Sequence, residues 1–471
     1  MGSTTDGWHG IGRTLVFAAL MWGAGQANAQ VDVWDAASRF HYNIEKVGVT
    51  ALPTTPPSYS VKVVFAVTNP KDVGMPWDIK NALPFQSSGA QLSLDIGWDP
   101  GSDFTNWGSS FGKSLVALGD GAALPVRVTG LTSKTTTAAA ECNATDCPGV
   151  TGLNRYFATA TVTPLPAGSA KTGRVVLEGH PVCNGVPGVS CPPAAVPPAA
   201  AYLNIPATTA TANFTFAATG TLAAMVANDP RRAIVDINKC KTCHDGKDHG
   251  TGIVPRLSLH GANRNESLAA CVVCHNANQT DVPYRRATTA TEDARIAGPE
   301  VPVDFKTMVH SIHAGGFRKQ PLVIIGRNSS VNDFSDVRFP RTLRDCTNCH
   351  IDANGKGTFE LPLRAGVLGT TIATKSTYLT VPRSIDADPT NDTKISPIAA
   401  VCSSCHDKAE VKSHMVKTGG ASFATTQAAI GTTVRERCAN CHGPGKEEDV
   451  RRVHEIRGTG AGGGSEHHDD D

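Results

Sequence analysis

The pattern Cys-x-x-Cys-His occurs five times in the second half of this 471-residue chain and constrains its fold more than any other feature. In one turn of helix, positions i, i+3 and i+4 share a face, so both thiols and the imidazole point the same way. The thiols can then bond to the two vinyl groups of a haem while the histidine coordinates its iron. This pattern is the attachment signature of c-type haem. The five copies are Cys240–His244, Cys271–His275, Cys346–His350, Cys402–His406 and Cys438–His442.

The fivefold repetition decides against coincidence, zinc sites and redox dithiols. From the Cys and His frequencies, on the order of 0.01 chance matches are expected in such a chain. Zinc ribbons pair their Cys-x-x-Cys units at closer spacing and need no histidine directly afterwards. The sequence therefore predicts five covalently bound haem c groups. Their attachment cysteines are Cys240, Cys243, Cys271, Cys274, Cys346, Cys349, Cys402, Cys405, Cys438 and Cys441, and their proximal metal ligands are His244, His275, His350, His406 and His442.

The two halves of the chain differ in composition. All six Trp lie at or before Trp107, whereas residues 228–471 are poor in aromatic residues and broken by Gly, Pro and Asp. Because such a segment could hardly build a close-packed core from side chains alone, we expect the haems to fill it.

The first half alternates between apolar and polar residues as β-strands do. The expected strands are Tyr59–Val67, Gln91–Ile96, Leu124–Val128, Tyr156–Val162, Arg174–Leu177 and Asn213–Phe216. We expect a multidomain protein, with an N-terminal all-β sandwich or barrel domain over residues 30–227 and a mostly irregular and α-helical pentahaem c-type cytochrome domain over residues 228–456. Pro192–Ala201 is expected to be a loop, and residues 457–471 are expected to form a disordered tail.

The second axial ligand separates an electron carrier from a catalyst, because iron with a protein ligand on both faces cannot bind substrate. We predict His260, His310, His313, His414 and His454 as distal metal ligands. His310 and His313 lie three residues apart in a predicted helix and would each reach a different iron. The sixth candidate, His249, is expected to be a surface residue or a neighbour of a ligand.

The remaining histidines and two methionines are given other roles. Met308 and Met415 each adjoin a candidate histidine, so we expect them to pack against a haem edge. Haems with histidine on both faces, without methionine ligation, should have fairly low potentials. His41 and His180 belong to the first half and are expected to be surface residues.

The N-terminus has the features of an export signal. Arg13 precedes the apolar run Leu15–Trp22, and Ala27-Asn28-Ala29 is a small-residue cleavage site, which predicts a signal peptide over residues 1–29. No later segment approaches the roughly 18 apolar residues of a membrane helix, and no cysteine follows the apolar run to carry a lipid. We expect an exported protein, at the cell surface or in the periplasm of a Gram-negative bacterium, without an integral membrane segment or a lipid anchor.

Four cysteines, Cys142, Cys147, Cys183 and Cys191, lack the haem signature. In an exported domain they are expected to form two disulfides, for which three pairings are possible. The local spacing favours Cys142 with Cys147 and Cys183 with Cys191. A redox-switch role is weakly supported, because the spacing is not Cys-x-x-Cys.

Five stretches of the second half resemble the OmcA/MtrC-type outer-membrane multihaem cytochromes of metal-respiring bacteria. The resemblance covers about residues 228–456 and implies that His260, His310, His313, His414 and His454 are distal ligands. It also implies a β-barrel domain beside a pentahaem domain. Family members typically repeat this unit to reach ten haems and are usually lipoproteins, whereas this chain has one unit. The resembling stretches are Arg231–Asp236, His260-Gly261, Asp304–Gly316, Ser396–Val401 and His414-Met415 with Gly419-Gly420.

We therefore expect an electron carrier rather than an enzyme, with at most non-specific metal-reductase activity and no catalytic residue. Expected partners are other cytochromes or an outer-membrane conduit, and the terminal acceptor could be a flavin or a metal oxide. With 43 Lys and Arg against 42 Asp and Glu, there is no basic excess to favour nucleic acid. Two alternatives stay open: an oxyanion reductase with one open haem, and a subunit of a haem filament or other homo-oligomer.

Overall fold

The computed structural model of the chain describes residues 32–55, 57–99, 125–163, 171–191, 202–217, 219–223, 231–353, 355–386 and 389–456. The expected signal peptide, the Pro192–Ala201 loop, the boundary after residue 227 and the tail from residue 457 lie outside these residues. We call the described residues 32–223 the β part and the described residues 231–456 the C-terminal part. The structure is rich in β-strands, and its helices are short.

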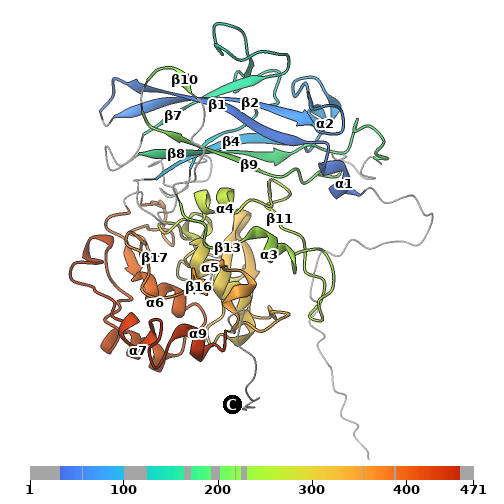
Figure 1. The fold of residues 1–471 in the computed structure, drawn as a ribbon. Coiled ribbons are helices and arrows are strands. Elements are labelled where there is room, and N and C mark those ends of the chain that lie inside the picture. The colour runs from blue at the N-terminus through green and yellow to red at the C-terminus, as the bar shows by residue number, and fades with distance from the viewer. Residues whose placement is uncertain are drawn as a thin grey trace, which may run out of the picture.

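Two antiparallel sheets form the β part and share one apolar core (Figure 1). The first sheet has the order β10 (Leu222–Ala223), β1 (His41–Leu52), β2 (Ser58–Asn69), β7 (Tyr156–Val162), β6 (Ala140–Glu141), with β3 (Met75–Pro76) paired to β2. The second has the order β5 (Val126–Val128), β4 (Gln91–Asp99), β8 (Thr172–His180), β9 (Ala210–Thr215). Within the described residues both sheets are open, so they do not form a closed barrel.

Alternation of side chains in β2, β4 and β8 builds this core. Leu92, Leu94 and Ile96 of β4 and Val175 and Leu177 of β8 are all at most 2% exposed and belong to one apolar cluster with the first sheet. Because side chains alternate between the faces of a strand, the residues between them point to the other face. Short helices α1 (Val33–Ala37) and α2 (Leu83–Gln86) flank the sheets.

The other face of the second sheet is also buried, although it is polar. Asp95, Arg174 and Glu178 are each at most 2% exposed. Val176, on the same face, packs with helix α4 (Leu268–Cys274) of the C-terminal part. Figure 1 shows β8 and β9 directly above this helix. The C-terminal part therefore covers a sheet face that would be wet in an isolated domain.

Because the C-terminal part packs on this face of the sheet, one prediction from the sequence was wrong. His180, at the end of β8, was expected at the surface but is 2% exposed. Burial lowers the pKa of its imidazole. Its neighbour Gly179 donates a backbone hydrogen bond to Asn263 of the C-terminal part, at 2.9 Å. His41, by contrast, is exposed.

The C-terminal part consists of short helices and two-stranded hairpins joined by turns. Its strand pairs are β11 (Ser258–Leu259) with β12 (Arg264–Asn265), β13 (Val323–Gly326) with β14 (Ser330–Asp333), β15 (Asp352–Ala353) with β16 (Lys356–Gly357), and β17 (Thr370–Ala373) with β18 (Thr393–Ile395). Besides α4, its α-helices are α3 (Ile237–Lys241), α5 (Phe305–His313), α6 (Pro397–Cys402), α7 (Ala409–Lys417), α8 (Ala439–His442) and α9 (Val450–Val453). Among the described residues, no helix is long and apolar enough to cross a membrane.

Candidate haem-binding centre

Each Cys-x-x-Cys-His pattern forms one turn of helix. In all five, the backbone N–H of the histidine donates to the carbonyl of the first cysteine, at 2.8–3.0 Å. The two thiols and the imidazole therefore lie on one face of the turn, as covalent haem attachment requires. These patterns lie at the ends of α3, α4 and α6, on the 3-10 turn η6 (Cys346–Asn348) and on α8. All ten of their cysteines are free thiols, outside any disulfide.

Every proximal histidine faces one of the five predicted distal histidines. The ring-centroid distances are 6.0 Å for His260 with His275, His310 with His350 and His406 with His454, 6.1 Å for His244 with His313, and 6.3 Å for His414 with His442. The angle between the two ring planes varies from 16° to 89° among the pairs, although the centroid distance stays nearly the same. Direct stacking of the rings would not produce this combination.

This distance is close to the one that a shared iron would impose. An imidazole nitrogen binds a metal at about 2.0–2.1 Å and lies about 1.2 Å from the centre of its ring, so two rings on opposite sides of one ion are about 6.4–6.6 Å apart. The donor set of each centre, two thiols and an imidazole on one side and a second imidazole opposite, therefore fits a haem c with two histidine ligands.

Hydrogen bonds fix the orientation of most of these rings. In seven of the ten histidines the Nδ1 atom is bonded to an oxygen of the chain, at 2.6–3.1 Å, which leaves Nε2 to face the partner ring. The oxygen is a backbone carbonyl except at His350, where it is the Thr358 hydroxyl. Such partners set the tautomer and the direction of a ligating imidazole. The six backbone acceptors could not be predicted, because a backbone carbonyl leaves no mark in a sequence.

Burial keeps several of these imidazoles neutral, which is the ligating form. It lowers the pKa of His350 to about 3, with smaller contributions from neighbouring cations. Burial likewise lowers the pKa values of His275, His310 and His313. An uncharged ring offers its lone pair to a metal without first losing a proton.

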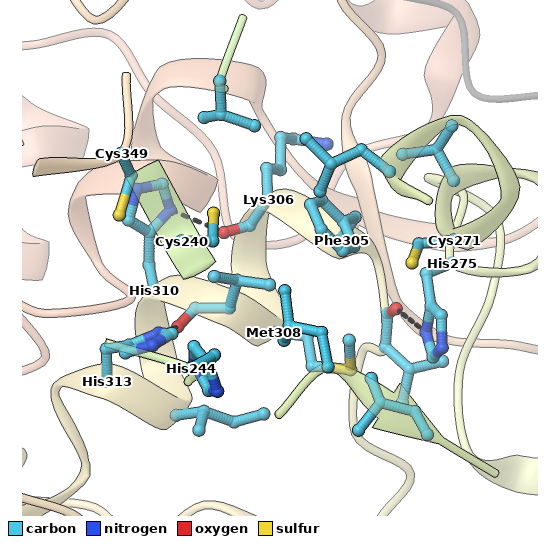
Figure 2. A pocket seen from close by; sticks show the side chains of 18 of the residues that line it. Cys240, His244, Cys271, His275, Phe305, Lys306, Met308, His310, His313 and Cys349 are labelled. Carbon is cyan, nitrogen blue, oxygen red and sulfur yellow. Dashed lines mark hydrogen bonds between the residues drawn. The ribbon is translucent and has the colours of Figure 1, made fainter. Parts of the chain in front are cut away.

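A cavity of about 2310 Å³ runs through the C-terminal part and is lined by the ligands of four of the five pairs. It is larger than the roughly 300–1,000 Å³ of an ordinary ligand pocket, so it has room for several macrocycles. Helix α5 crosses it, with His310 and His313 toward one side and Phe305 near His275 on the other (Figure 2). On the His310 side, the side chains of Cys240 and Cys349 are in hydrogen-bond contact, so the first and third attachment patterns adjoin.

The fifth pair, His414 with His442, belongs to the edge of the molecule. Its histidines are not among the described residues that line the cavity, and both His414 and Cys441 are exposed. Met415, next to His414, is buried in a small apolar cluster with Ala399 and Ala400 of α6. Met308 lines the cavity.

The remaining cysteines and histidine of the sequence analysis have other partners. The structure joins Cys142 to Cys147 and Cys183 to Cys191, which is the pairing that the spacing favoured. His249 faces no proximal histidine, and its Nε2 lies 2.9 Å from Oδ1 of Asp245. It is therefore a neighbour of the first attachment pattern, as expected.

A group of charged residues between the two parts was not predicted from the sequence. Asp95, Arg127 and Glu178 of the β part meet Arg264, which lies four residues after His260. In the sequence Asp95 and Arg127 alternate with apolar residues, and that alternation is the signature of a solvent-facing position. A single sequence carries no signal that this face is covered.

One family of known proteins matches the residues of this site. The sequence model described as "Outer membrane cytochrome MtrC/MtrF-like, domains II/IV" matches residues 232–455. A crystal structure of MtrC from Shewanella baltica is similar at 15% sequence identity and a TM-score of 0.47, covering 87% of this chain and 52% of that one. The chain thus spans about half the length of that structure. A search of curated proteins gave no match.

The matched residues contain all five attachment patterns and all ten facing histidines. The match therefore supports covalently bound haem c and multihaem electron transfer. Residues 232–455 of this chain are therefore similar to domains II and IV of the MtrC/MtrF-like outer membrane cytochromes.

Proposed function

We propose that the chain carries five haem c groups, each with histidine on both faces, and passes electrons among them. The observation that carries this proposal is the set of five histidine pairs, all with ring centroids 6.0–6.3 Å apart. Five pairs use up every predicted proximal and distal histidine. No iron would keep an open face for substrate, which favours a carrier over a catalyst.

In this proposal the haem supplies reversible one-electron chemistry and the chain supplies attachment, orientation and insulation. Paired cysteines hold each macrocycle covalently, and the backbone carbonyls on Nδ1 keep the ligating rings in place. The contact between Cys240 and Cys349 supports close approach of the first and third groups. Close approach of neighbouring groups is what electron exchange along the chain needs.

We further propose a β-sandwich domain over residues 30–227 and a pentahaem domain over residues 228–456. The shared apolar core of the two sheets supports the first domain. Among the described residues of the second domain, the apolar clusters are small and the cavity is large, which supports haems as its core.

The proposed place of action is the outside of the outer membrane or the periplasm, with other cytochromes or a conduit as electron donors. A flavin or a metal oxide is the proposed terminal acceptor. The matching family model describes an outer membrane cytochrome, which supports this location. The exposed His414 at the fifth pair supports exchange with an external partner, since electron transfer to a partner needs a haem near the surface.

Spin-state spectroscopy of the oxidised protein tests the proposal against the reductase alternative. Five iron centres with two histidines each should give an entirely low-spin spectrum that cyanide and nitrite leave unchanged. A high-spin signal from one of the five haems in intact protein, with nitrite binding there, would instead favour the reductase. Native mass analysis of the same sample tests the filament alternative, which requires assemblies that grow with concentration.

A further inference from the structure

One of the five proposed distal ligands is held differently from the others. His310, His313 and His414 lie on helices and His454 caps one, whereas His260 lies in the turn of the β11–β12 hairpin. We call residues 258–265 the His260 hairpin. Its turn has three consecutive residues in the left-handed region, with φ of 55° at His260, 71° at Gly261 and 69° at Ala262. Left-handed backbone at His260 and Ala262 persists only where the surroundings impose it.

The surroundings that impose it belong largely to the β part. Asn204 donates to the Gly261 carbonyl at 3.1 Å, and the Gly179 N–H donates to the Asn263 carbonyl at 2.9 Å. The main chain of Asn265 makes two further bonds with Thr209, at 2.9 and 3.1 Å.

The Asn265 side chain ties the turn to the β part. It is 1% exposed, and its Nδ2 donates to the Ala207 carbonyl and to the Ala262 carbonyl, both at 2.8 Å. One amide thus links a β-part carbonyl to the left-handed turn that carries His260.

A buried ionic cluster holds the same hairpin from the side. The Nε atom of Arg264 lies 2.7 Å from a carboxylate oxygen of Glu178. Arg127 contacts Glu178 and Asp95, and the side chains of Glu178 and Asp95 are 1% and 3% exposed. The β part alone contributes two carboxylates and one guanidinium to this cluster. Arg264 of the C-terminal part supplies the second positive charge, so the charges cancel only while the two parts stay together. Separating them would leave buried charges unpaired, which is strongly unfavourable.

We propose that the β part positions His260 on the iron of the second haem, and that loosening this interface opens that iron alone. The inference rests on the proposed five-haem function. Asn265 and Glu178 are then positioning residues, because they act on the iron through the turn that carries His260. The other four distal ligands belong to α5, α7 and α9 and keep their places. The opened iron would accept a small exogenous ligand such as carbon monoxide.

The test compares three variants of the full, haem-loaded protein. H260A removes the ligand itself and serves as the reference, with one carbon monoxide bound per reduced protein. N265A and E178Q should produce the same new signal, with carbon monoxide binding rising from none to as much as one per protein. All five haems should stay attached, and four should stay low-spin. The double variant H260A/N265A should bind no more carbon monoxide than H260A, since both changes open the same iron.

Two further variants complete the test, one as a milder change at the same contact and one as a control away from it. T209V removes only the hydroxyl that Asn265 N–H donates to, and should open the second iron in part even if N265A does not fold. R155Q breaks the 3.2 Å ion pair of Arg155 with Glu45, in the β part away from the hairpin, and should bind no carbon monoxide.

The outcomes separate this inference from the function on which it rests. If the unaltered protein already contains high-spin haem, the five-haem carrier itself is wrong. If the unaltered protein is low-spin and N265A, E178Q and T209V stay low-spin, or a haem other than that of H260A opens, the positioning role of the β part is wrong.

Discussion

His310 and His313 leave the same turn of helix α5 but face the proximal histidines of two different attachment patterns. His310 lies against His350 and His313 against His244, with ring centroids 6.0 and 6.1 Å apart. Each ring is bonded through Nδ1 to the carbonyl four residues earlier, so both orientations are set by the helix itself. One rigid turn therefore fixes the relative position of the first and third proposed haems.

Replacing His310 with Met should raise the potential of one haem, on the order of 0.1 V, because methionine ligation favours reduced iron. The haem facing His313 should keep its ligands, since its distal ring has its own carbonyl partner at Val309. Potentiometric titration followed by optical and electron paramagnetic resonance spectra would measure both. The double variant H310M/H313M should shift two haems and slow electron transfer through the protein.

The matched control is H249A. His249 is bonded to Asp245 and faces no proximal ring, so its removal should leave all five potentials unchanged. An unshifted titration in H310M would show that His310 is not a ligand. A shifted one in H249A would make His249 the candidate in its place.

The mature protein should carry five covalent haems that survive denaturation and acid extraction. Mass measurement of the denatured chain counts them directly. Expression without the machinery for c-type haem attachment should leave residues 231–456 unfolded, because the cavity of about 2310 Å³ would then have no content to pack against. A count of four or fewer in fully matured protein contradicts the assignment of the five patterns.

Lys394 to Met should destabilise the protein by about 3 kcal/mol near pH 8, because it leaves the buried Asp392 carboxylate without its cation. Lys394 is 0% exposed, lies 4.0 Å from Asp392 and donates to Asn278 and Thr371. The loss should shrink at pH 5. Chemical unfolding at several pH values measures it, and the exposed Lys417 to Met serves as the control, with a change within about 0.5 kcal/mol.

The sign follows from the pKa values of the pair. Burial raises the pKa of Asp392 from 3.8 to about 6, so between these values the folded protein binds the extra proton and its stability falls as pH rises. Without Lys394 the pKa of Asp392 rises further, so the fall in stability continues to higher pH in the variant. The difference in the free energy of unfolding between the two proteins therefore grows as pH rises. Burial lowers the pKa of Lys394 from 10.5 to about 8, so in the unaltered protein stability rises between those values.

Removing either disulfide should lower the stability of the β part by about 2 kcal/mol, as expected for such short loops. The pairs are five and eight residues apart in sequence. Their cysteines are not among the described residues that line the cavity, so the haem spectrum and potentials should not change. Unfolding of C142A/C147A and C183A/C191A followed by circular dichroism, with redox titration of both, checks the two statements. A shifted haem potential on reduction would instead support a redox switch.

The strands of the β part were largely predictable because their signal is local. The run Tyr156–Val162 was predicted and observed with the same bounds, and Gln91–Ile96 extends to Asp99. Strand β1, His41–Leu52, was not predicted, because its apolar positions are interrupted at Glu45 and Lys46. The register with β2 shifts between Ile44 and Lys46, and this irregularity breaks the alternation that marks a strand.

Sequence spacing by itself determined the geometry of the attachment patterns. Within a helical turn, positions i and i+4 share a face whatever surrounds them, so Cys402 and His406 share a face for a local reason. The same reasoning put His310 and His313 on one side of a helix.

Only the tertiary structure decided which rings meet. His406 faces His454 from 48 positions away, and His275 faces His260 across a hairpin held by the other part of the chain. It also decided that Asp95, Glu178 and His180 are buried. Pairing and burial of this kind depend on contacts between segments distant in sequence, and the spacing of residues within one segment carries no record of what packs against it.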